Sequence, residues 1–334
     1  MSRWDAHRKS AETEACAMRI GFIGLGNVGG KLAGSLLRNG HDVVVRDLNP
    51  DLVAEFTARG AVAANSPRAL AEAVDIVITC LPSPAASAAV AEGIDGFLQV
   101  LRPGQVWMEM STTDYAEVLR LGAAVEACGA LFMECPVSGG CHRAETGNIS
   151  IFAGGPREGF DRVLPVLTTL GRRVLHTGPL GTASRLKVMT NYLCTVHLVA
   201  LAEALTTCKA AGLDMNTTYE AIRISSGNSF VHETESQVIL NGSRDINFTM
   251  DLVSKDIGLF DDLAQQHGVP LEMSPLIVRL FNEARATYGD REFSPNIIRR
   301  FEEPLGLKVL GTGFPDQMVD DEPEEPGYEV VPNR

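Results

Sequence analysis

The chain has 334 residues, 45% of them hydrophobic, which is enough for about two domains with substantial cores. Its formal net charge of -13 argues against a nucleic-acid or anionic-membrane partner, because both bind basic surfaces. Seven cysteines form no C-x-x-C pair, and several lie in apolar runs, where a free thiol packs as a small hydrophobe. We therefore expect a reducing, cytoplasmic compartment.

Residues 1–17 carry charges throughout and lack the apolar core of a secretory signal, so we expect a flexible leader. The longest uncharged apolar run follows Lys187 and is shorter than the roughly 20 residues that a membrane span requires. We expect a soluble protein.

The first element is an apolar run at residues 19–25, followed at once by Gly24-x-Gly26-x-x-Gly29 and a helical apolar pattern that ends at Gly40. A second buried strand, at residues 43–45, ends at Asp47. Strand, glycine turn, helix and acid together are typical of dinucleotide binding: the backbone approaches the pyrophosphate and the acid receives the ribose hydroxyls. The glycine pattern alone, without the strand, helix and acid, would be weak evidence for dinucleotide binding.

The charge of Asp47 would repel a 2′-phosphate, which favours NAD over NADP. Arg46 precedes it, and neighbours on a strand point to opposite faces, but a strand end can bend. NADP therefore stays open.

Strands and helices then alternate, which predicts a mostly parallel, doubly wound sheet whose ligands lie beyond the carboxyl ends of the strands. Pro82, Ser111 and Ser138 each follow such an end. The strands are expected at residues 75–81, 106–110, 131–135, 149–153 and 173–176, with a helix at 157–170.

Nothing interrupts a helix from Ser184 to about Ala211, and Gly212 supplies a stop. Its apolar side chains fall on nearly every face, so most of it should be buried. Four further helices are expected, at residues 216–224, 230–240, 252–267 and 275–288. We predict a flexible leader at 1–17, a Rossmann domain at 18–183, an all-helical domain at 184–310 joined by the long helix, and an acidic flexible tail at 311–334.

Three local features admit two interpretations each. Ser138-Gly139-Gly140 could present N–H groups to a carboxylate, with Arg143 binding a second anionic group, or could be an ordinary turn beside a solvated arginine. Lys255 lies beside an acid and could be a solvated charge pair. Lys187, at the head of an apolar helix, could simply snorkel. The scattered histidines predict no metal site.

Four stretches in this order resemble the β-hydroxyacid dehydrogenase family, which includes 3-hydroxyisobutyrate dehydrogenase. They are residues 21–27, 136–140, 181–191 and 255–259. The resemblance implies that Lys187 is the catalytic acid/base, that Asn191 supports it, and that Lys255 reaches the site from the helical domain. It also implies a homodimer or homotetramer.

The residues assigned to the cofactor are Gly24, Leu25, Gly26, Asn27, Val28, Asp47, Leu81, Pro82, Thr112 and Lys255. Those assigned to a small-molecule carboxylate substrate are Ser111, Ser138, Gly139, Gly140, Arg143 and Phe230. The implied reaction interconverts a 3-hydroxy acid, or a β-hydroxy amino acid, and its aldehyde or ketone with NAD, or NADP. The alternatives are an imine reductase and a non-catalytic dinucleotide-binding protein.

The chain departs from the family pattern at Ala183, where a glycine is usual, at Val28, where methionine is common, and at residues 141–143. Ala183 could alter the turn before the catalytic helix, and residues 141–143 put 3-hydroxyisobutyrate itself in doubt as the substrate.

Overall fold

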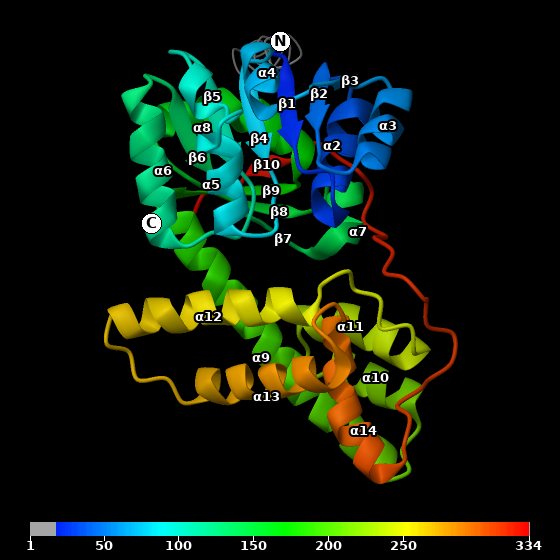
Figure 1. The fold of residues 1–334 in the computed structure, drawn as a ribbon. Helices are drawn as coiled ribbons and strands as arrows, with labels where there is room; N and C mark the ends of the chain where they lie inside the picture. Colours follow the sequence, from blue (N-terminus) through cyan, green and yellow to red (C-terminus); the bar gives the residue numbers. More distant parts are fainter. Residues whose placement is uncertain (1–17, 334) are drawn as a thin grey trace. The chain divides into compact units, whose positions relative to one another are not determined.

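The structure is a computed structural model that describes residues 18–333, so the expected leader at 1–17 lies outside the described residues. The chain divides into two compact units (Figure 1). The first runs to Lys187 and resumes at Asp321, and the second comprises Val188–Asp320.

The first unit is built on one ten-stranded sheet with helices on both faces (Figure 1), which confirms the doubly wound architecture. Its strands are β1 (Ile20–Ile23), β2 (Val43–Arg46), β3 (Val62–Ala63), β4 (Ile76–Thr79), β5 (Val106–Glu109), β6 (Leu131–Glu134), β7 (Val137–Ser138), β8 (Ser150–Gly154), β9 (Arg173–Gly178) and β10 (Tyr328–Glu329). The order across the sheet is β10-β9-β8-β6-β5-β4-β1-β2-β3, and β7 pairs with β8. β1 to β6 are parallel, whereas β8 runs antiparallel to β6.

Buried apolar side chains on the two faces of the strands hold the covering helices, as expected for a sheet with no solvated face. One face packs against α2 (Asn27–Arg38), α3 (Pro50–Ala58), α7 (Gly140–Glu145) and α8 (Arg157–Leu170); the other packs against α4 (Pro67–Glu72), α5 (Pro84–Glu92) and α6 (Tyr115–Ala127). The Ser66 side chain caps α4 by accepting the Ala69 N–H, and Pro67 occupies the first turn of that helix.

The acidic tail differs from the expectation of a flexible segment. Tyr328 and Glu329 form β10, which pairs in parallel with the start of β9, and the segment from Asp321 belongs to the first unit. The tail is rich in acids and prolines and poor in apolar groups, which favours disorder. In the structure, the open edge of β9 supplies backbone partners for β10, and basic side chains on the unit supply counter-charges for the acids.

The second unit is helical, as predicted. It contains most of α9 (Thr182–Ala210), then α10 (Met215–Arg223), α11 (Phe230–Asn241), α12 (Met250–Gln266), α13 (Met273–Tyr288) and α14 (Arg299–Leu305). Its core combines apolar side chains of α9, α11, α12 and α13, including Leu205, Ile239, Ile257 and Phe281. The unit boundary falls inside α9, after Lys187, rather than at residue 183.

α9 is less buried than its composition predicted. Leu186 and Leu193 are 37% and 44% exposed, and only 39% of its most apolar stretch is buried within the chain. By length and composition alone α9 could cross a membrane, a test that the core helix of a soluble protein also passes. The helix carries Lys187, Asn191 and Glu203 within this length.

Candidate active site

The glycine turn after β1 has the shape that a dinucleotide requires. Gly24 has φ of +97°, and a Cβ there would lie 2.3 Å from the Cys80 carbonyl oxygen. A Cβ on Gly29 would lie 2.0 Å from the Gly24 oxygen, so the helix packs closely on the turn. Gly26, just before α2, faces open space, and no side chain caps that helix start among the described residues. The residues present therefore fit a pyrophosphate at the N-terminus of α2.

Asp47 lies at the end of β2, beside this turn. Its Oδ2 accepts the Leu25 N–H at 2.6 Å and its Oδ1 accepts the Asn49 N–H at 2.8 Å. The carboxylate thus fixes the turn and keeps lone pairs for ribose hydroxyls. The Arg46 guanidinium donates to the Asp47 backbone oxygen, so it lies against the Asp47 backbone, although its strand position predicted the opposite face.

Ser111 connects two neighbouring strand ends. Its Oγ accepts the Leu81 N–H at 2.7 Å, which joins a predicted substrate residue to a predicted cofactor residue. Its own N–H donates to Glu109 Oε1 at 2.8 Å. Glu109 is almost completely buried, and burial raises the pKa of its carboxyl while the Ser111 hydrogen bonds oppose that rise. This buried acid therefore fixes the backbone of Ser111.

The turn after β7 presents two successive glycines with positive φ, Gly139 at +135° and Gly140 at +87°. Backbone of this kind forms a concavity that suits an oxyanion. Arg143, on α7, runs its side chain over the turn, since a Cβ on Gly139 would lie 3.3 Å from Arg143 Cδ. The Arg143 guanidinium is also 3.0 Å from Glu322 of the tail, so it is not the simple solvated cation of the alternative interpretation.

Glu134, at the end of β6, holds the first turn of α9. Its Oε1 accepts the N–H groups of Gly181 and Ala183, and its Oε2 accepts that of Ser184 at 2.9 Å. Three helix-terminal N–H groups thus share one buried carboxylate. Burial raises the pKa of Glu134, and these N–H donors oppose the rise. Gly154 leaves room for this side chain, because a Cβ there would lie 2.3 Å from Glu134 Oε1.

Lys187 lies one turn further along α9 and is only 7% exposed. A snorkelling lysine would carry its ammonium to water, so this burial argues against that interpretation. The turn before Lys187 is fixed twice more. The Arg185 guanidinium stacks 3.6 Å from the centre of the Tyr115 ring, and a Cβ on Gly181 would lie 2.2 Å from that ring.

Ala183, where family members usually have glycine, does not lie in the turn. It is a buried residue of α9, and the positive φ of +88° belongs to Gly181. A Cβ is compatible with helical backbone, so the substitution leaves the turn unchanged.

In the second unit, Asp256 of α12 holds two predicted site residues. Its Oδ2 accepts the Asn191 amide, and its Oδ1 lies 2.8 Å from Lys255 Nζ. Asp256 is 3% exposed, so the interpretation of Lys255 and Asp256 as a solvated pair is wrong. Phe230 lies at the start of α11 with 44% of its surface exposed.

The contacts described above therefore connect predicted site residues within the first unit and, separately, within the second unit. The remaining cofactor assignments lie at three places: Asn27 and Val28 are the first residues of α2, Pro82 follows Leu81 after β4, and Thr112 follows Ser111 after β5. Sequence reasoning gave no supporting role to Glu109, Glu134 or Asp256, which are all buried. Glu109 and Glu134 each end an apolar strand, a position where an acid is unusual, and that was the available signal.

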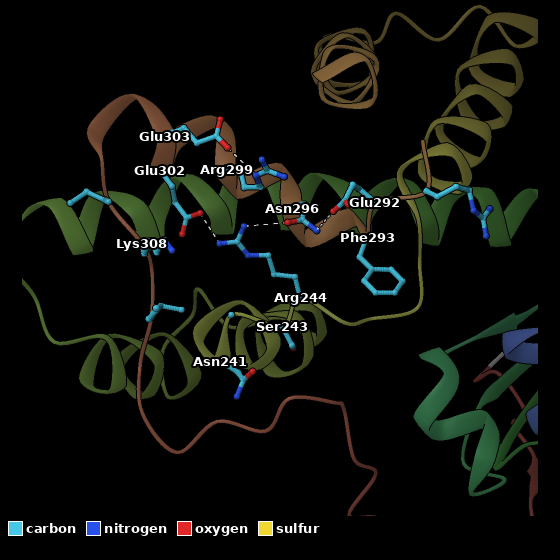
Figure 2. A pocket seen from close by; sticks show the side chains of 14 residues that line it. Asn241, Ser243, Arg244, Glu292, Phe293, Asn296, Arg299, Glu302, Glu303 and Lys308 are labelled. Carbon is cyan, nitrogen blue, oxygen red and sulfur yellow. Dashed lines mark hydrogen bonds and ion pairs between the residues drawn. The ribbon is translucent and has the colours of Figure 1, made fainter. Parts of the chain in front are cut away.

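A cavity of about 770 Å³ lies elsewhere, within the second unit (Figure 2). Arg244 crosses it to Glu302 at 2.6 Å, and Asn296 lies beside the same guanidinium. Glu302 Oε1 also accepts the Val309 N–H, so this buried ion pair fastens the segment after α14. None of the predicted site residues lines the cavity. Across residues 18–333, no group of three or more metal-ligating side chains is gathered.

Comparison with known proteins gives the family. A profile described as the NAD binding domain of 6-phosphogluconate dehydrogenase matches residues 19–178. A second, described as NAD-binding of NADP-dependent 3-hydroxyisobutyrate dehydrogenase, matches residues 181–300. A 2-(hydroxymethyl)glutarate dehydrogenase from Eubacterium barkeri is 33% identical over 88% of this chain and 98% of its own. The mitochondrial 3-hydroxyisobutyrate dehydrogenase of Mus musculus is 32% identical over 86% of this chain and 88% of its own.

Solved structures agree. A crystal structure of 3-hydroxyisobutyrate dehydrogenase from Salmonella typhimurium has a TM-score of 0.77 at 30% identity, covering 85% of this chain and 99% of that one. An imine reductase from Myxococcus stipitatus, solved with NADP+, is 17% identical with a TM-score of 0.59, which shows a shared fold alone. The chain therefore belongs to the β-hydroxyacid dehydrogenase family and is an NAD(P)-dependent oxidoreductase that acts on CH–OH groups.

Proposed function

We propose that this enzyme interconverts a small 3-hydroxy acid and its aldehyde or ketone, with Lys187 as the general acid/base. The observation that carries the proposal is the burial of Lys187 on a helix whose start is fixed by Glu134. Lys187 belongs to the same unit as the glycine turn at Gly139 and the dinucleotide turn at Gly24. A buried amine loses solvation of its charged form, which is the condition that a general base needs.

The glycine turn, the start of α2 and Asp47 would hold the cofactor, whose nicotinamide supplies or accepts the hydride. We propose NAD as the preferred form, because the Asp47 carboxylate is fixed by two backbone N–H groups and cannot swing away from a 2′-phosphate without losing them. The contact of Arg46 with the Asp47 backbone leaves NADP binding possible.

The substrate would be held through its carboxylate by Ser138, Gly139 and Gly140, with Ser111 as a further hydroxyl. Lys187 would take the proton from the substrate hydroxyl during oxidation and return it during reduction. Asn191 follows on α9, and its amide is fixed by Asp256, so it can hold one orientation. Arg143 is proposed to contact the distal, polar part of the substrate.

The names of the two relatives suggest a substrate class. 3-Hydroxyisobutyrate and 2-(hydroxymethyl)glutarate both carry a hydroxymethyl group on the carbon next to a carboxylate. They differ in the other carbon substituent on that same carbon. We propose that this chain acts on the same unit, a 2-substituted 3-hydroxypropanoate.

We further propose a cytoplasmic homodimer or homotetramer. Exposed apolar side chains on the helical unit, including Leu193, Phe230 and Leu276, are available to an interface between subunits. Light scattering coupled to size-exclusion chromatography gives the mass directly, and a monomer at micromolar concentration would contradict this.

The function is tested by offering the purified enzyme a panel of 3-hydroxy acids, β-hydroxy amino acids and cyclic imines with both cofactors. We expect NADH formation from 2-substituted 3-hydroxypropanoates and no NADPH-dependent imine reduction. Turnover of imines alone would replace the proposal with the imine reductase alternative, and tight NAD binding without any turnover would support a non-catalytic role.

A further inference from the structure

The C-terminal strap, residues 321–333, is held on the first unit by backbone and by charge. Tyr328 N–H donates to the Arg172 oxygen at 2.9 Å and Val330 N–H to the Val174 oxygen at 2.7 Å, as β10 adds to β9. Figure 1 shows this segment in red, returning to the sheet. The strap carboxylates face arginines of α2, α7, α8 and β9 and one arginine just before β9. The pairs are Glu322 with Arg143 and Arg173, Glu324 with Arg38, Glu325 with Arg172, and Glu329 with Arg157.

One of these contacts lies beside the predicted substrate turn. Glu322 Oε1 is 3.0 Å from the Arg143 guanidinium, whose Cδ lies over Gly139. The Glu322 backbone is fixed as well, because the Asn148 side chain donates to its carbonyl oxygen at 2.9 Å. A second cation, Arg173, lies 3.6 Å from Glu322 Oε2.

A single half-exposed ion pair of this kind contributes little to binding energy. Glu322, however, does not have to be recruited from solution. The strand pairing of β10 and the Asn148 hydrogen bond keep its carboxylate near Arg143, so its effective concentration there is high. A substrate anion must displace it or share Arg143 with it.

We propose that Glu322 is a specificity-determining residue. Its carboxylate pairs with Arg143 and repels a second carboxylate on the substrate, so substrates with an uncharged polar distal group are preferred. The strap supplies the negative charge that repels a dicarboxylate substrate. The turn at Ser138 supplies the groups that bind the carboxylate of the preferred substrate. This inference rests on the proposed function, since it assumes that the turn beside Arg143 receives the substrate.

Two compounds with the same reacting unit make the test direct. 2-(Hydroxymethyl)glutarate differs from 3-hydroxyisobutyrate by a distal carboxylate carried on one further methylene, and its 5-amide is the uncharged counterpart. The ratio of kcat/KM for the dicarboxylate to that for 3-hydroxyisobutyrate is measured for the full-length enzyme and for E322Q. The matched control is E329Q, which removes a strap carboxylate that contacts Arg157 instead.

We expect E322Q to raise this ratio about fivefold at low salt and less at high salt, as for one exposed ion pair. E329Q should leave the ratio unchanged, and R143Q combined with E322Q should abolish the gain. The ratio for the 5-amide should change less than that for the dicarboxylate. An unchanged ratio in E322Q, or an equal rise in E329Q, would overturn the inference.

If no variant turns over any 3-hydroxy acid, the proposed function is wrong, but the role of Glu322 can still be tested by measuring ligand binding. Calorimetry with glutarate in the presence of NADH then compares the wild-type enzyme with E322Q. About fivefold tighter glutarate binding by E322Q supports the inference, and equal binding contradicts it.

Discussion

Glu134 in the first unit and Asp256 in the second are both buried carboxylates behind predicted site residues, but their partners differ in kind. Glu134 accepts three backbone N–H groups at the start of α9, whereas Asp256 binds the side chains of Asn191 and Lys255. A carboxylate that accepts backbone N–H groups at a helix start fixes the position of that start and so of the residues that follow it. A carboxylate that accepts side-chain donors fixes only the orientation of those side chains. Glu134 thus controls the placement of Lys187, and Asp256 controls the orientation of two individual groups.

The largest expected effect is that of Lys187→Ala, which removes the group that the Glu134 anchor is proposed to place. Loss of a general acid/base lowers kcat by about 10²–10⁴-fold. NADH binding, measured by fluorescence titration, should stay within about twofold of wild type, since the glycine turn is separate. Lys209→Ala, on the same helix, is the control. Near-normal turnover in Lys187→Ala would refute the assignment.

Glu134→Gln comes next and tests the backbone anchor. One amide oxygen replaces two carboxylate oxygens, so at least one of the N–H groups of Gly181, Ala183 and Ser184 loses its acceptor in a buried place. Leaving a buried donor unpaired costs about 1–3 kcal/mol, which should appear in denaturant unfolding. If Glu134 also positions Lys187, kcat falls with KM little changed. A stability loss with normal kcat would restrict Glu134 to a structural role.

Asp256→Asn should be milder, because the partners are side chains that can find other acceptors. We expect weaker support of Asn191 and Lys255 and roughly a tenfold fall in kcat/KM, the size of one charge-assisted hydrogen bond. Unfolding should change less than in Glu134→Gln. A larger stability loss in Asp256→Asn than in Glu134→Gln would reverse the comparison.

Asp47→Asn examines a third carboxylate that binds backbone, at Leu25 and Asn49. Removing its charge lessens repulsion of a 2′-phosphate, so the preference of kcat/KM for NAD over NADP should shrink, by about tenfold or less. Asp51→Asn, on the neighbouring α3, is the control. A wild-type enzyme that already prefers NADP would contradict the role given to Asp47.

Glu235 of α11 is another buried acid, and its Oε1 accepts a weak hydrogen bond from the Cys194 thiol at 3.8 Å. Burial raises the pKa of Glu235 to about 8, and this hydrogen bond opposes the rise. The unfolded chain releases this proton near pH 4.5 and the folded chain near pH 8, so stability falls as pH rises between these values. Glu235→Gln should therefore raise Tm at pH 9 more than at pH 5. Glu233→Gln, exposed on the same helix, should not, and equal shifts at both pH values would refute this.

Much of the fold was predictable, because buried strands such as β2 and β4 are short apolar runs bounded by turn residues, and helices such as α9 have clear stops. The Lys187 and Gly139 positions were found from motifs. β10 was not, since two residues in an acidic, proline-rich segment carry no periodic pattern. The partners of that segment, such as Arg157, lie 172 residues away in sequence, and charge complementarity over such a distance is invisible within one stretch.

The pairing of β10 with β9 also bears on how the chain folds as it is synthesised. β9 leaves the ribosome well before β10, with the whole helical unit between them, so the sheet exposes an unpaired edge during that interval. Closing that edge requires a contact of very high sequence separation, which is a slow step for a chain. Truncation before residue 321 should therefore increase aggregation during refolding even where the native assembly tolerates the loss.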